Sequence, residues 1–165
     1  MNIISIQHSG TKLLVRKFQC DELALRDETE GLHVGHISTG QWPHIISRIK
    51  DPTIIPMRHP HLVWESWRRR EKNINELIEN YHLLIDLDQY QPFYVNIDLP
   101  IRDWQIDKIN TELNLTLAKE WPIINSVCGT YNIDPYTLNP PTSIKEMAKR
   151  YYCRETARRL NGANH

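Results

Sequence analysis

Residues 2–14 read NIISIQHSGTKLL and join a short apolar run to a glycine turn. The run at residues 2–7 contains β-branched residues and no breaker, which favours a strand. Ser9 and Gly10 interrupt this run, and from Lys12 to Leu25 the apolar residues are spaced roughly as on one face of a helix. The stretch therefore predicts a strand, a glycine turn and a helix in direct succession.

The same order repeats along the chain, because compact β-branched runs alternate with segments of helical spacing. Ser143 and Glu146 have the spacing of a capping box at the start of a final helix. The alternation predicts an α/β fold with a mostly parallel sheet between two layers of helices, and ligands in such folds bind at the carboxyl ends of the strands. Besides the first strand, turn and helix, the expected strands are 33–37, 53–57 and 93–97, and the expected helices 42–49, 74–85 and 106–113.

Length and composition are those of one globular domain. The chain has 165 residues and a formal net charge of zero, so an anion site must be local, and the composition does not favour a nucleic-acid partner. The absence of a signal-like segment or a membrane-length apolar window predicts a cytoplasmic protein without a membrane partner. Three cysteines without a CxxC pair favour reduced thiols over disulfides or zinc. We expect one compact domain over 1–165 with a frayed tail after Leu160.

The glycine turn has the residue types of an anion site. Gly10 allows backbone N–H groups to approach an anion closely, and the helix that follows directs its positive end to the same place. Thr11 adds a hydroxyl and Lys12 a cation. The turn does not match GxxxxGK followed by Ser or Thr, because no glycine precedes Gly10 and the lysine comes one place too late. A plain strand-to-helix turn is the alternative interpretation.

A second feature follows the strand expected at 53–57. Arg58 leaves this strand, and Ser66 lies eight positions later in the helix that follows. An arginine fork and a hydroxyl can hold one phosphate from two sides. The alternative is an arginine in a surface ion pair and a serine on a helix face.

A third feature is the segment LHVGHIS, which contains two histidines on a candidate strand. His36 lies near the edge of the sheet where the glycine turn is expected to open. A neutral imidazole at this position can take a proton from a hydroxyl or an amine near neutral pH. With eight histidines in the chain, an ordinary hydrogen-bonded or solvated side chain is the alternative.

Together these features resemble the sulfotransferase family over roughly residues 3–115. The stretch 8–13, HSGTKL, is similar to the family's phosphosulfate loop, and Arg58, Pro60 and Ser66 reproduce its phosphate motif. His36 precedes Arg58 by about the distance of the family's catalytic histidine. The stretches FYVNIDL at 93–99 and IDKINTELNL at 106–115 resemble the next strand and helix of the family.

The resemblance implies a P-loop-type fold and the cosubstrate 3′-phosphoadenosine 5′-phosphosulfate (PAPS), whose sulfuryl group goes to a hydroxyl or amine of an acceptor that the sequence does not identify. It implies that Arg58 and Ser66 hold the 3′-phosphate and that His36 is the base that deprotonates the acceptor. No metal is implied. The residues implied to surround the 5′-phosphosulfate are Ser9, Gly10, Thr11, Lys12 and Leu13, of which Lys12 also neutralises charge on the leaving phosphate.

The chain departs from the family in two places. The family's basic residue before the serine and glycine is His8 here, so a protonated His8 or Lys12 takes its catalytic role. The family's basic and glycine-rich closing loop has no counterpart after residue 115. Cations of the last helix are candidates to replace that loop, although a solvated face is the alternative: Lys149, Arg150, Arg154, Arg158 and Arg159.

Two other functions stay open. The first is a small P-loop nucleotide or nucleoside kinase, which needs magnesium ligands, and only Asp98 ends a strand suitably for that role. The second is a catalytically inactive nucleotide-binding or interaction protein of the same fold. The three arginines at 68–70 then mark a nucleic-acid or protein contact. The oligomeric state is not indicated by the sequence.

Overall fold

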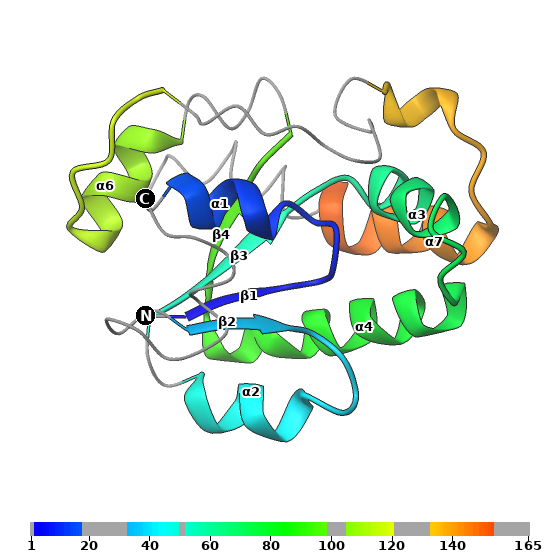
Figure 1. Cartoon of the computed structure of the whole chain (residues 1–165), viewed down its shortest axis with the longest axis horizontal. Coiled ribbons are helices and arrows are strands. Elements are labelled where there is room, and N and C mark those ends of the chain that lie inside the picture. Colours follow the sequence, from blue (N-terminus) through cyan, green and yellow to red (C-terminus); the bar gives the residue numbers. More distant parts are fainter. Residues whose placement is uncertain (1, 18–32, 50–51, 99–104, 121–132, 154–165) are drawn as a thin grey trace.

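The computed structural model describes residues 2–17, 33–49, 52–98, 105–120 and 133–153 (Figure 1). Strands and helices alternate along the chain. The strands are β1 (Asn2–Ser5), β2 (His33–His36), β3 (Thr53–Met57) and β4 (Phe93–Asn96). The α-helices are α1 (Thr11–Lys17), α2 (Trp42–Arg48), α3 (Pro60–Arg68), α4 (Ile74–Asp86), α6 (Ile106–Leu113) and α7 (Thr142–Met147). Shorter helical turns are η2 (Leu87–Tyr90), η3 (Pro135–Thr137) and the π-helical η4 (Ala148–Cys153).

The four described strands form one all-parallel sheet in the order β2-β1-β3-β4. The chain runs from β1 outward to β2 and then crosses back to β3 on the other side of β1. Consecutive crossovers therefore diverge between β1 and β3, and ligands in such folds bind at the carboxyl ends of the strands at this point. The topology places the candidate site at the loop after β1 and the residues that follow β3.

Helices cover both faces of the sheet because successive strand residues point to opposite sides. Ile3 packs with α1 and α6, whereas Ile4 packs with α2, α3, α4 and α7. The same split separates Ile54 from Ile55 in β3. The predicted α/β architecture, a parallel sheet between helices, is therefore confirmed.

The expected elements recur with small shifts at their ends. The predicted capping box at Ser143 is wrong, because α7 begins at Thr142 after Pro141, and Ile144 donates its N–H to the Pro141 carbonyl at 3.0 Å. A proline ring presets the extended entry into this helix, so no hydroxyl cap is needed. The expected frayed tail after Leu160 lies outside the described residues, as does the part of the first helix beyond Lys17. Within the described ranges, no helix has the length and apolar character to cross a bilayer.

Gly10 is required by the backbone and by packing. Its φ is +99°, a region that other residues rarely adopt, and an added Cβ would lie 1.9 Å from Cδ1 of Ile97. Ile97 follows β4 and is buried in the core beneath α1 and α6. The glycine therefore lets the loop after β1 approach the end of β4, whatever ligand the loop binds.

We expect Gly10→Ala to lower the free energy of unfolding by about 1–3 kcal/mol, because it adds backbone strain and displaces Ile97. Urea unfolding followed by circular dichroism measures this loss. Gly40→Ala is the matched control, since a Cβ there meets nothing within 4 Å. Equal stability losses in the two variants would contradict the packing argument.

Candidate functional site

The candidate site is the loop of residues 6–10 at the carboxyl end of β1. Ser9 closes the loop by donating its N–H and its hydroxyl to the Ile6 carbonyl, at 3.1 and 2.6 Å. His8 has a φ of 69°, a left-handed conformation in which histidine is several-fold enriched among non-glycine residues. Two adjacent turns, at His8 and Gly10, thus curl the backbone tightly before α1 begins.

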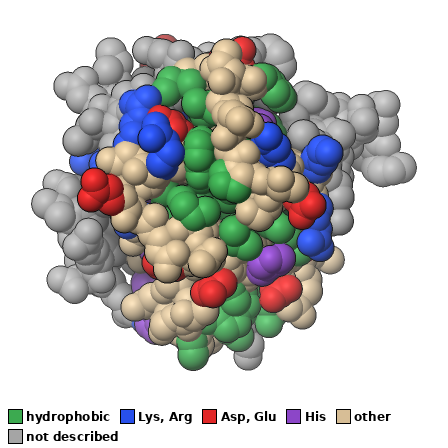
Figure 2. Space-filling view, turned by 90° about the vertical axis from the view of Figure 1, so that its right-hand side faces the viewer, with side chains coloured by type: hydrophobic (Ala, Val, Ile, Leu, Met, Phe, Trp, Pro, Cys, Tyr) green, Lys and Arg blue, Asp and Glu red, His purple; other side chains and the backbone are tan. Residues whose placement is uncertain are grey.

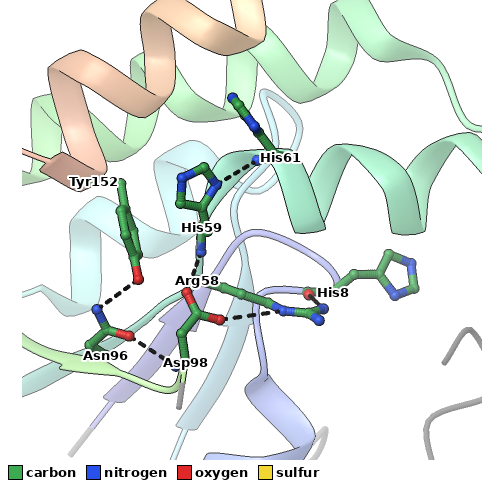
Figure 3. Close-up of polar contacts among 7 residues, drawn as sticks. All are labelled: His8, Arg58, His59, His61, Asn96, Asp98 and Tyr152. Atoms are coloured by element: carbon green, nitrogen blue, oxygen red, sulfur yellow. Dashed lines mark hydrogen bonds and ion pairs between the residues drawn. The ribbon is translucent and has the colours of Figure 1, made fainter. Parts of the chain in front are cut away.

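Arg58 connects this loop to the ends of β3 and β4 (Figure 3). Its Nη1 donates to the His8 carbonyl at 3.2 Å, and its Nε lies 3.8 Å from Oδ1 of Asp98. The side chain is only 3% exposed. In Figure 3 the carbonyl of His8 faces the guanidinium, whereas its imidazole points away from it. Arg58 therefore links the loop after β1 to Asp98, which follows β4.

Asp98 is held by a polar network that the sequence did not indicate. Its Oδ2 accepts the His59 N–H at 2.6 Å, and its own N–H donates to Oδ1 of Asn96 at 2.9 Å. Nδ2 of Asn96 donates to the Tyr152 hydroxyl at 3.2 Å. Burial raises the pKa of Asp98, and the Arg58 guanidinium opposes that rise. These contacts hold Asp98 against Arg58.

Helix α3 and the turn after it contact the loop from a second side. Trp67 donates its Nε1–H to the Gln7 carbonyl at 2.9 Å, and the Lys72 ammonium hydrogen-bonds to Oε1 of Gln7. The same ammonium lies 5.0 Å from the centroid of the Trp67 ring. The loop after β1 is thus bound on its main chain by one residue of α3 and on its side chain by the turn that follows.

Cations converge on His8 from several elements. Burial lowers the pKa of His8 to about 4, and further lowering comes, in decreasing order, from Arg70, Lys72, His36 and Arg58. Nε2 of His8 is buried without a hydrogen-bond partner among the described residues. A pKa of about 4 favours a neutral ring at pH 7 in the ligand-free site. An anion at this position would offset the positive charges.

The surface at this end of the molecule also carries positive charge. Figure 2 views it from the side toward which β1 and β2 run, and shows Lys and Arg side chains on either side of a hydrophobic area, with Asp and Glu side chains among them. Lys12 is exposed at the second position of α1.

His36 approaches the loop through a pair of hydroxyls. It is the last residue of β2 and is in register with Ser5, the last residue of β1. Nδ1 of His36 lies 3.3 Å from the Ser5 hydroxyl, which is 2.5 Å from the hydroxyl of Thr11. The structure therefore brings three of the predicted features together at one edge: the glycine turn, His36 and Arg58.

Other predicted residues lie farther inside or outside the site. Leu13 packs in the core beneath α1, and Ser66 lies in α3 with its side chain 3% exposed. Lys149 and Arg150 are exposed, and the remaining cations proposed for the last helix lie outside the described residues. The structure thus describes Ser66 as a buried helix residue, and its contact with a phosphate stays a prediction.

The three arginines at 68–70 do not act as one unit. Arg68 and Arg69 both donate to the Glu65 carboxylate at 2.8 Å, and hydrogen bonding with Arg68, chiefly, lowers the pKa of Glu65 to about 2. Arg70 instead influences His8. Sequence reasoning missed Arg70 and Lys72 as site residues. In the sequence they are adjacent to the arginines that pair with Glu65, and only the folded turn after α3 brings them near His8.

Comparison with protein-family models, with curated proteins and with solved structures found no significant match to this chain. The functional argument therefore depends on the residues and geometry described above.

His59 makes the stability of this region depend on pH. Burial, and secondarily His61, lower its pKa to about 4, below the ordinary value of 6.5. The unfolded chain therefore binds more protons between these values, so stability is complete above pH 6.5 and falls as the pH drops toward 4, by at most about 1.4 kcal/mol per pH unit. His8 adds to the same slope.

His59→Asn is expected to reduce this slope, because asparagine keeps a side-chain acceptor at the start of α3 but does not titrate. Urea unfolding at pH 7, 6 and 5 measures the slope. His82→Gln, at an exposed position of α4, serves as the control and should retain it. An unchanged slope in His59→Asn would show that His59 does not cause the acid sensitivity.

Proposed function

We propose that this chain is a P-loop-type, sulfotransferase-like protein that binds PAPS and transfers its sulfuryl group to a hydroxyl or amine. The observation that carries the proposal is the Arg58–His8 contact. Two motifs that lie 50 residues apart meet there at 3.2 Å, at the divergence of β1 and β3. The sulfotransferase resemblance expects its two phosphate motifs to serve one ligand, and this contact supports the proposal because it brings the two motifs together.

The chemistry of the loop fits a phosphosulfate group. Backbone N–H groups of a tight glycine loop, the Thr11 hydroxyl and nearby cations are donors suited to an anion. The orphaned Nε2 of His8 adds a buried polar atom without a partner among the described residues. Lys12, exposed on α1, contributes charge from the solvent side. These groups support binding of the 5′ end of PAPS.

PAPS supplies an electrophilic sulfur and a phosphate leaving group. His36 takes the proton of the acceptor while the acceptor oxygen or nitrogen bonds to sulfur and the bond from sulfur to the phosphate oxygen breaks. The Ser5 hydroxyl at Nδ1 orients the imidazole for this task. Cations beside the loop stabilise the charge that develops on the departing phosphate. Positioning and electrostatics carry the reaction, without a covalent enzyme intermediate.

Arg58 has a second task in this proposal. At 3% exposure, with its guanidinium against His8 and Asp98, it holds the phosphosulfate loop in shape. Its contact with a 3′-phosphate, together with Ser66, is the part that only the resemblance supports. The Asp98 carboxylate already accepts the His59 N–H and faces Arg58. This also favours a sulfotransferase over a kinase, because a kinase would need this carboxylate as a magnesium ligand.

We expect 3′-phosphoadenosine 5′-phosphate (PAP) to bind without metal, and Arg58→Lys to weaken it about tenfold or more, because lysine cannot reproduce the arginine fork. Isothermal titration calorimetry measures both affinities. Arg69→Lys, at a surface ion pair, is the control and should bind PAP normally. Binding of ATP with magnesium in preference to PAP would instead identify a kinase.

His36→Gln is expected to lower sulfuryl transfer by about 10²–10⁴-fold, the usual contribution of a general base, with little change in PAP affinity. Release of PAP from PAPS in the presence of a panel of phenols, alcohols and amines measures transfer. His44→Gln, at an exposed position of α2, should leave the rate unchanged. An undiminished rate in His36→Gln would remove the base assignment, and PAP binding without any transfer would identify an inactive nucleotide binder.

A further inference from the structure

We propose that Lys72 supplies the cation that the sulfotransferase resemblance expects at position 8, and that it binds the 5′-phosphate end of the nucleotide. This inference depends on the proposed function for the identity of the ligand. It assigns a binding role to a residue that lies 64 positions beyond His8 and outside the motifs that resemble the family.

The main chain fixes the position of Lys72. Helix α3 ends in a pair of hydrogen bonds, from the Glu71 N–H to the Arg68 carbonyl at 3.0 Å and from the Lys72 N–H to the Trp67 carbonyl at 3.1 Å. Glu71 has a φ of 54°, the left-handed conformation that reverses the chain in a Schellman motif. The reversal turns Lys72 back toward the sheet.

The side chain then meets the loop directly before position 8. The Lys72 ammonium hydrogen-bonds to Gln7 and lies over the Trp67 ring, and Trp67 in turn donates to the Gln7 carbonyl. A lysine ammonium is a compact charge with three donors, so it can hold Gln7 and still donate to an anion. The ammonium is therefore anchored one residue from the position of the expected cation.

The local charge pattern separates Lys72 from the neighbouring cations. Arg68 and Arg69 are 57% and 40% exposed and pair with the buried carboxylate of Glu65. Lys72 and Arg70 instead act on His8, whose pKa they lower. Glu71 between them is exposed. The two largest contributions of neighbouring charges at His8 thus come from the turn after α3, and an anion there would offset them.

The backbone conformation at position 8 suits a histidine. The left-handed φ of His8 directs its imidazole away from Arg58 (Figure 3), and Arg58 takes the carbonyl. Histidine is among the residues that tolerate this conformation best. Position 8 therefore holds a residue suited to the loop conformation, and the positive charge is supplied by Lys72 in the turn after α3.

Calorimetry with three nucleotides tests the assignment on the full chain. Lys72→Gln should weaken PAP and adenosine 5′-phosphate about 10- to 100-fold, the effect of losing a hydrogen bond to a charged group, and leave adenosine 3′-phosphate unchanged. Lys72→Met keeps the aliphatic stem over Trp67 and should show the same loss, whereas Lys72→Arg should bind nearly as the wild type does. Arg69→Gln is the surface control.

A charge placed at position 8 should compensate. Adding His8→Lys to Lys72→Gln is expected to restore most of the lost PAP affinity, which a purely structural role of Lys72 would not allow. Thermal unfolding of each variant separates loss of binding from loss of folding.

The outcomes distinguish this inference from the proposed function. If the wild type binds PAP and the Lys72 variants bind it equally well, or lose all three nucleotides alike, the role of Lys72 is overturned while the proposed function stands. If the wild type binds inorganic pyrophosphate but no adenosine phosphate, and Lys72→Gln weakens the pyrophosphate, the anion site stands and the proposed function fails. Binding of neither ligand class overturns both.

Discussion

The contact between Arg58 and the carbonyl of His8 is the interaction on which the carboxyl edge of the sheet depends. It joins the loop after β1 to the end of β3, and Asp98 extends the link to β4. A buried guanidinium is costly without partners, and removing one member of such a pair typically costs about 3–5 kcal/mol. The hydrogen bonds of His59, Asn96 and Tyr152 therefore hold Asp98 in place as a partner for Arg58.

The loop after β1 is held by hydrogen bonds from two sides, and positively charged groups lie around its His8 side chain. Trp67 and Lys72 hold Gln7, Arg58 holds His8, and the resulting arrangement brings several cations around one neutral imidazole. Repulsion among like charges opposes folding, and the hydrogen bonds to the loop offset it.

Much of the fold followed from local patterns. Hydrophobic spacing predicted all four described strands and most helices, because amphipathic periodicity reflects which face of an element is buried. The capping box at Ser143 failed because Pro141 already sets the entry into α7. The cations at 68–72 could not be sorted from sequence, since Glu65 pairs with Arg68 and Arg69, and the left-handed Glu71 reverses the chain before Lys72.

The sequence by itself determined the order of strands and helices and the presence of a glycine turn after β1, because both depend on neighbours in the chain, whereas the packing of Gly10 against Ile97 is tertiary. Only the tertiary structure decided that β1 lies between β2 and β3, that Arg58 turns inward to His8, and that Lys72 reaches Gln7. These facts depend on strand pairing and on packing between distant segments, where the free energy comes from contacts that no local pattern encodes.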